Sequence, residues 1–519
     1  MYKYIRIRRM KMEKLNKYER IFGDRAEKRI ELEVALPEYL PSCARILRVT
    51  SRSTNEKQVS GSAVICACKV GFSVLYASDS EDSLRTADFT TDLEHSFTIR
   101  GDRGLDDEAF VECIVTTSGE EARILNPRRL LLTCVAAVGV NAVARRKYEL
   151  PEISEDGVIV KRKALTSTVE IAELPKLEIR LSETVSPGAD APKVGEIVLA
   201  DCRLGRPSHN VRDGRCVFSG DAQVSFIYRD AENDENYVTF SKILPYTAEA
   251  TWDFSEDSTV LCSAKILKVT AEPRIDSYGD SSGIGLSAVG QLCGRSFRKC
   301  AVEYCEDAFG TECEVDIEKQ ILPTDVIKGR LSDSAERCES VAVKLGGITE
   351  IVSADIEICD TEASASQGKI TSVSSAVLRI LGRDAQGNLE SASASFDISF
   401  TANDSLDASL NGVRIDSTLG TSDVTAKIEN GIVKVCFKAY FDAVILATDS
   451  ICAVLSALPD ENKAIRRDLS RYVICYPNPD DTVWSVAKRY RVSPDDVRSE
   501  NSLSDDSLSG KRCIIIPRQ

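Results

Sequence analysis

One stretch of sequence occurs three times along this chain, at nearly constant spacing. The segments are VGFSVLYASDSED, AQVSFIYRDAEND and AVLRILGRDAQGN, which place Tyr76, Tyr228 and Gly382 at the same point, 152 and 154 residues apart. A second set of similar segments, spaced by 151 and 153 residues, aligns at Ile124, Ile275 and Ile428. Because two separate sets of segments recur at nearly the same spacing, the sequence predicts three tandem copies of one domain.

Within each copy, apolar and polar side chains alternate. Runs of Val, Ile, Thr, Ala and Ser follow a period of two and are interrupted by Asp, Asn and Gly. Such strands bury one face and expose the other, which favours antiparallel, sandwich-like packing. At 519 residues the chain can build several cores. We therefore predict a mainly β fold with three tandem antiparallel β-sandwich-like repeats, at residues 30–150, 160–308 and 312–457.

Two segments outside the repeats are predicted to lack a core. The basic N-terminal segment, residues 1–29, has eight Lys or Arg and two Glu among its first 20 residues. It is either solvated or placed to contact an acidic partner or a membrane surface. All three methionines, Met1, Met10 and Met12, lie here, so the translation start is open. Residues 459–471, PDENKAIRRDLSR, are charged and poor in large apolar side chains, which predicts a linker.

The last 48 residues, 472–519, carry strand and helix signals in a fixed order. After a short strand, Asp481 or Thr482 can cap a helix that places Val483, Trp484, Ala487 and Tyr490 on one face. A serine followed by proline at 493–494 predicts a second helix start. A glycine at 510 then allows a tight turn before a β-branched run too short for a helix. The module is predicted to be βααβ.

Charge and composition exclude several function classes. The formal net charge of -15 disfavours nucleic-acid binding, which needs a surplus of Lys and Arg. We find no apolar run of 18 residues and no signal-peptide pattern, so we expect no transmembrane segment and a cytoplasmic location. The 18 cysteines are mostly single residues within apolar runs, such as Cys134, Cys262, Cys436 and Cys452. We expect them to be reduced core thiols.

Motifs for catalysis are scarce. The two histidines, His95 and His209, have no neighbouring motif that would pair a nucleophile with a base. Paired carboxylates such as Asp505 and Asp506 lie among Ser and Gly, which favours solvated turns. Gly-rich residues 279–290 lack the lysine of a phosphate-binding loop. We expect no catalytic site, no cofactor, no metal site and a protein that is not an enzyme.

The C-terminal module resembles a LysM domain. The resemblance rests on the Asp-Thr-Val-Trp helix entry, the Val-Ser-Pro-Asp-Asp second helix start, the Asn-Ser-Leu loop and the closing Gly-Lys-x-x-Ile-Ile-Ile-Pro strand. Modules of this family hold N-acetylglucosamine polymers in a shallow groove between two loops. By matching positions, the groove would be formed by Asp480, Asp481, Thr482, Val483 and Trp484 on one side and by Asn501, Ser502 and Leu503 on the other.

Asp480 and Trp484 stand apart among these positions. Asp480 stands where the family usually has Gly, so a side chain and a charge are added where a sugar would approach the backbone. This departure disfavours glycan binding. Trp484 is either an exposed anchor for a partner or a core residue, and its place on the apolar helix face favours the core.

The repeats resemble the SPOCS domain of endospore-forming bacteria. The residues that carry this resemblance are LPEYLPSCARILRV (36–49), the strand ending at Tyr76, and ILNPRRLLLTCVAAVGV. Repeated SPOCS domains followed by one LysM module are similar to spore coat morphogenesis proteins of the SipL type. The resemblance implies a non-enzymatic scaffold in the mother-cell cytoplasm, with the LysM module docked to the coat-basement protein SpoIVA at the forespore surface. The alternative is a cell-wall protein that binds peptidoglycan.

Overall fold

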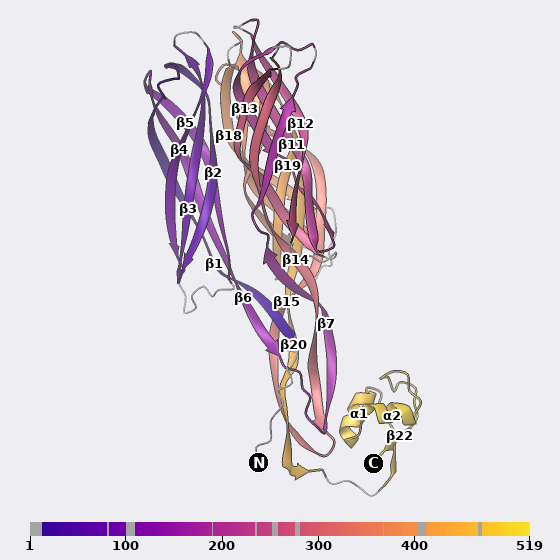
Figure 1. Cartoon of the computed structure of the whole chain (residues 1–519). Helices are drawn as coiled ribbons and strands as arrows, with labels where there is room; N and C mark the ends of the chain where they lie inside the picture. The colour runs from indigo at the N-terminus through magenta and orange to yellow at the C-terminus, as the bar shows by residue number, and fades with distance from the viewer. Residues whose placement is uncertain are drawn as a thin grey trace.

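The computed structural model describes residues 13–79, 83–99, 109–188, 190–233, 236–251, 258–275, 281–366, 368–387, 389–402, 412–465 and 470–518. Strands dominate the structure, and they form three β units side by side above a stalk of long strands (Figure 1). A small module with two helices lies at the foot of the stalk. Within the described ranges, neither helix has the length and hydrophobicity needed to cross a membrane.

The first unit is a sandwich of two three-stranded antiparallel sheets, ordered β1-β6-β5 and β2-β3-β4. The inward-facing apolar residues of both sheets form one continuous core. This alternation is the physical basis of the sandwich, because each sheet covers the apolar face of the other. Its strands are β1 (Glu13–Ala35), β2 (Cys43–Ser60), β3 (Ala63–Ser78), β4 (Leu84–Thr98), β5 (Phe110–Asn126) and β6 (Arg129–Leu150).

The second and third units repeat this topology, each around its own core. In the second unit two of the strand positions are split into pairs of shorter strands. The second unit comprises β7 (Val158–Glu173), β8 (Leu177–Val185), β9 (Val194–Leu204), β10 (Ser208–Arg212), β11 (Arg215–Asp230), β12 (Tyr237–Thr251), β13 (Thr259–Ile275) and β14 (Ser281–Gly310). The third comprises β15 (Cys313–Val341), β16 (Ile348–Ser366), β17 (Lys369–Asp384), β18 (Leu389–Thr401), β19 (Arg414–Glu429) and β20 (Ile432–Ala464). The predicted fold of three tandem antiparallel sandwiches is confirmed.

The repeated tyrosine has the same role in the first two units. Tyr76 and Tyr228 are buried, and their hydroxyls donate to the carbonyls of Pro41 and Pro192 at 3.0 and 3.2 Å. Gly382 takes this place in the third unit. A Cβ atom there would lie 2.3 Å from a methyl group of Ile348. The close approach of β16 explains why the third copy departs from the tyrosine.

The three units converge on shared apolar clusters. Leu75, Ile227 and Leu381 occupy equivalent strand positions and meet in one cluster. Two further clusters likewise combine residues from all three units. Because equivalent surfaces meet in the middle, the body has approximate three-fold symmetry built from one chain.

The segments predicted as a basic tail and as a linker differ from expectation. From Glu13 onward the N-terminal segment is strand β1, paired along its length with β6. Its Leu15 and Tyr18 are buried, while Lys17 forms an ion pair with Asp325 of the third unit at 2.5 Å. Most polar residues of this segment are exposed positions of a paired strand, so they do not mark a solvated tail. Residues 1–12 lie outside the described ranges.

The linker begins later than its composition suggested. Strand β20 continues to Ala464, where it pairs with Cys313, and Pro459 pairs with Val315. These residues form the foot of the stalk. Only residues after 464 connect the third unit to the C-terminal module.

The cysteines are not all reduced thiols. Two disulfides are present, Cys66 to Cys113 between the sheets of the first unit and Cys338 to Cys436 between β15 and β20. Fourteen cysteines are free. Cys134 is buried as expected, Cys262 is half-buried, and Cys452 is exposed. A cysteine within an apolar run of the sequence can therefore be either a free thiol in the core or half of a disulfide to another strand.

Candidate functional site

The C-terminal module consists of β21 (Tyr472–Cys475), α1 (Val483–Tyr490), α2 (Pro494–Glu500) and β22 (Ile514–Pro517). Thr482 caps α1: its hydroxyl accepts from the amide of Ser485, whose hydroxyl accepts from the amide of Thr482. Ser493 caps α2, with Pro494 at the first helical position. Both helix starts and the βααβ order match the sequence patterns.

Two loops meet beside the start of α1. The amide of Val483 donates to the carbonyl of Asp506 at 3.0 Å, and Thr482 forms a β-bridge with Ser507. The loop before α1 and the loop before β22 therefore form one surface. It lies where the resemblance to LysM domains places the groove.

The eight predicted groove residues differ in their access to this surface. Asp480, Thr482 and Ser502 are exposed, while Asp481 and Leu503 are half-buried. The side-chain NH2 of Asn501 donates to the backbone carbonyl of Ile515 at 2.6 Å, and the side-chain oxygen of Asn501 accepts from the backbone N–H of Ile515 at 2.6 Å. Asn501 thus fastens the loop after α2 to β22. Val483 is fully buried and its backbone amide is bonded to Asp506, so it holds the two loops together and does not reach the surface.

The loop surface is acidic. Exposed Asp480, Asp505 and Asp506 lie on the two loops, together with half-buried Asp481. The pKa of Asp481 is lowered because its carboxylate accepts from the amide of Asn478 and pairs with Arg489, at 2.9 and 2.6 Å. Asp481 therefore shapes the loop, and Asp506 pairs with Arg498, so Asp480 and Asp505 are the exposed carboxylates of this surface that form no ion pair among residues 470–518.

Trp484 does not face the groove. It is 9% exposed, and its indole packs edge-on against Phe309 of β14, with ring centroids 5.1 Å apart. The indole N–H donates to Asp307 at 3.0 Å, and Lys488 pairs with the same carboxylate at 2.6 Å. Trp484 therefore joins the module to the foot of the stalk, as a core residue shared by both.

Asp307 is held as an anion by this contact. Burial alone would raise its pKa, but hydrogen bonds from Lys319, Lys488 and Trp484 outweigh burial and hold the pKa well below its usual range. Lys319 lies on β15, at 2.8 Å. One carboxylate thus links the second unit, the third unit and the C-terminal module. No local sequence signal marks a contact between residues so far apart in the chain.

A second polar network, which the sequence did not predict, joins the units of the body. Asp201 of the second unit accepts from Arg48 and Arg52 of the first, at 3.0 and 2.6 Å. Burial alone would raise the pKa of Asp201, but the two guanidinium groups lower it below its usual value.

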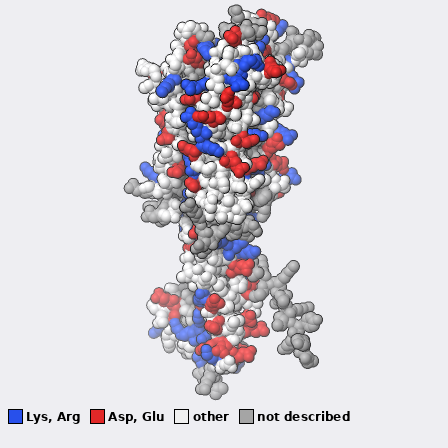
Figure 2. All heavy atoms as spheres, turned by 90° about the vertical axis from the view of Figure 1, so that its left-hand side faces the viewer, with Lys and Arg blue, Asp and Glu red and all other residues white. Residues whose placement is uncertain are grey.

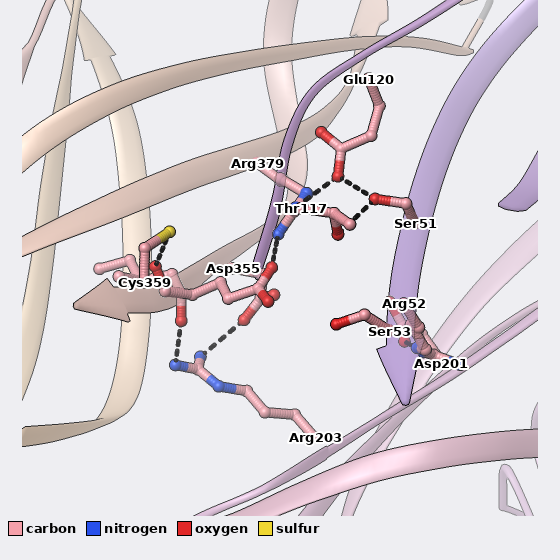
Figure 3. A network of polar contacts seen from close by, with 12 residues as sticks. Ser51, Arg52, Ser53, Thr117, Glu120, Asp201, Arg203, Asp355, Cys359 and Arg379 are labelled. Carbon is pink, nitrogen blue, oxygen red and sulfur yellow. Dashed lines mark hydrogen bonds and ion pairs between the residues drawn. The ribbon is translucent and has the colours of Figure 1, made fainter. Parts of the chain in front are cut away.

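The other two junctions between units use the same chemistry (Figure 3). Arg203 of the second unit pairs with Asp355 of the third at 3.0 Å. Arg379 of the third unit pairs with Glu120 of the first at 2.7 Å and also with Glu357. Burial raises the pKa of Glu357 despite the adjacent guanidinium. These carboxylates are engaged by arginines, an arrangement that suits a structural link between units.

Both histidines pack against aromatic rings. His95 packs edge-on against Phe97 at 4.6 Å, and His209 lies beside Phe218. Burial lowers the pKa of His209. Among the described residues, no group of three His, Cys, Asp or Glu side chains could hold a metal ion.

Comparison with known families agrees with the geometry of the C-terminal module. The LysM domain family matches residues 478–517. No curated protein and no solved structure matches the chain. The SPOCS resemblance of the three sandwiches stays a prediction. The chain thus carries a LysM domain, a module associated with carbohydrate and peptidoglycan binding, at the foot of a three-unit β body.

Proposed function

We propose that this chain is a non-enzymatic scaffold and that its LysM domain recruits a partner. The contact of Asp307 with Trp484 and Lys488 carries the proposal, because it fixes a binding domain to the stalk while its loop surface stays open. Ion pairs at all three junctions between units support a stable body that holds this domain in place.

The SPOCS resemblance indicates where this scaffold would act and which partner it would bind. It favours spore-coat assembly in the mother-cell cytoplasm, with a SpoIVA-type protein at the forespore surface as the partner. Biolayer interferometry between the purified full chain and the SpoIVA-type protein of the same host tests the proposal. We expect saturable binding, which is lost when residues 470–519 are deleted. Absence of binding by the full chain would overturn the proposed partner.

A second candidate function is peptidoglycan binding at the loop surface. The LysM match and the exposure of Asp480, Thr482 and Ser502 favour it. If the surface binds glycan, Asp480→Gly should raise affinity for chitooligosaccharides about tenfold in calorimetry, since it removes a side chain and a charge where the sugar approaches. Asp480→Asn is the matched control, because it removes the charge and keeps the side chain. If the chain binds glycan tightly and has no affinity for the SpoIVA-type protein, the proposed scaffold in spore-coat assembly is wrong. The protein would then act in the cell wall.

A further inference from the structure

The outer face of the LysM sheet exposes four large apolar side chains. Tyr472, Ile474 and Tyr476 alternate along one face of β21 and the residue after it, and they are 50%, 62% and 73% exposed. Ile515, 40% exposed, lies opposite Ile474 on β22. We call these four residues the sheet face. Contiguous exposed apolar groups on a soluble domain mark an interaction site.

The sheet face points away from the contact that holds the domain. The helical layer meets the body through Trp484, which packs against Phe309, while the helices cover the inner side of the two strands. Docking to the stalk therefore leaves the sheet face open. It is also distinct from the loop surface, which lies at the start of α1.

Basic side chains stand at both ends of the sheet face. Arg471 precedes β21, and Lys511 and Arg512 precede β22. All three are exposed, and none forms an ion pair among residues 470–518. The acidic residues of the domain instead gather on α2 and the loops, where Arg489 and Arg498 pair with some of them, and they are Asp480, Asp481, Asp495, Asp496, Glu500, Asp505 and Asp506. The domain is therefore polarised, with an acidic loop side and a basic, aromatic sheet side.

This combination has the composition of a protein interface. Tyrosine and arginine are enriched at interface centres because they combine apolar area with hydrogen-bonding capacity. A basic rim favours an acidic partner through complementary potential, which raises the association rate. The remainder of the chain is strongly acidic, and acidic and basic side chains intermingle over its visible face (Figure 2). The basic rim of the sheet face therefore has the opposite sign to the net charge of the remaining chain.

We propose that the sheet face docks a folded protein with an acidic rim around an apolar patch, separately from the loop surface. This inference rests on the proposed scaffold function and specifies which side of the LysM domain the partner covers. The four apolar residues form the centre of the interface, and Arg471, Lys511 and Arg512 steer the encounter.

The test uses the full chain and the SpoIVA-type protein in biolayer interferometry. We expect Ile474→Ser and Tyr476→Ser each to weaken binding at least about tenfold, as central interface residues do. The matched controls are Ile321→Ser and Tyr39→Ser, whose side chains are 71% and 85% exposed on the body. They should bind as the wild type does. The double variant Lys511→Glu/Arg512→Glu should slow association mainly at low salt. Unchanged melting temperatures would show that the variants are folded.

Other outcomes overturn the inference in distinguishable ways. If Asp480→Gly changes protein binding while the sheet-face variants bind normally, the partner uses the loop surface, and the scaffold proposal survives alone. If the sheet-face variants lose only chitooligosaccharide binding, the face is a glycan platform. If they abolish only a concentration-dependent dimer seen in analytical ultracentrifugation, it is a self-association surface. Failure of the wild-type chain to bind the SpoIVA-type protein overturns both proposals.

Discussion

Asp307 is the residue on which the position of the LysM domain depends most. Replacing it with Asn removes the charge that Lys488 and Lys319 share, so the domain should lose about 2 kcal/mol of docking free energy. The measurement is Trp484 fluorescence in a Trp252→Phe background, where undocking shifts the emission to longer wavelength. Asp316→Asn, on an exposed position of β15, is the control and should leave the emission unchanged.

The same contact has a defined pH dependence. Because the pKa of Asp307 is lower in the folded protein than in the unfolded chain, its contribution is complete above the unfolded pKa of about 4 and is lost only as pH falls toward the folded value. Trp484 emission should therefore stay constant from neutral pH down to about pH 4. A red shift between pH 7 and pH 5 would contradict this assignment.

Two buried tyrosines predict alkaline sensitivity. Burial raises the pKa of Tyr18 and of Tyr76 to about 12, because it disfavours the phenolate. A raised pKa gives stability that is complete below the unfolded value of about 10 and declines as pH rises toward about 12. Tyrosinate absorbance should rise together with unfolding in this range. Tyr18→Phe and Tyr76→Phe should each reduce the pH dependence of the unfolding free energy there.

At the scale of the element, Gly382 and Gly71 make a matched pair on central strands of different units. A Cβ at Gly382 would lie 2.3 Å from Ile348, whereas at Gly71 the nearest atoms are 3.9 Å away. Gly382→Ala should destabilise the third unit by about 2 kcal/mol through overpacking. Gly71→Ala should change stability by less than about 1 kcal/mol. Denaturant unfolding measures both, and equal effects would refute the steric explanation.

The sequence predicted elements best where one physical pattern dominated. Period-two alternation and the repeated Tyr76 and Tyr228 segments gave the sandwiches, and the caps at Thr482 and Ser493 gave both helices. Strand β1 was missed because only Leu15 and Tyr18 are fully buried within a basic stretch. The end of β20 was missed because charged residues can occupy the exposed face of a paired strand.

The candidate site was predicted only in part. Matching positions to the LysM family located the loop surface, yet Trp484 and Val483 point inward and Asn501 is engaged by β22. The contacts of Asp307 and Arg379 join segments distant in sequence. Their geometry depends on how whole units pack, which residue spacing does not encode.

At the scale of the whole molecule, Arg379 secures one junction between units. Arg379→Met would leave Glu120, whose side chain is 2% exposed, without its counter-ion. We expect a loss of about 3 kcal/mol and faster limited proteolysis between units. Adding Glu120→Gln should restore part of the loss, because the more deeply buried of the two carboxylates then carries no unpaired charge, while Glu357, 39% exposed, still lacks its partner. Arg215→Met removes an exposed pair with Glu249 and should cost less than about 1 kcal/mol.

The joining of all three units in one chain also sets the valency of the molecule. A trimer of separate chains would carry one LysM domain, here called the head, on each subunit. It would therefore present three identical heads. Here a body with three similar flanks carries a single head, attached beside β14 of the second unit. Each flank is therefore distinguishable from the others by its distance and direction from that head. A partner that recognises the body and the head together can bind in only one of three otherwise similar orientations.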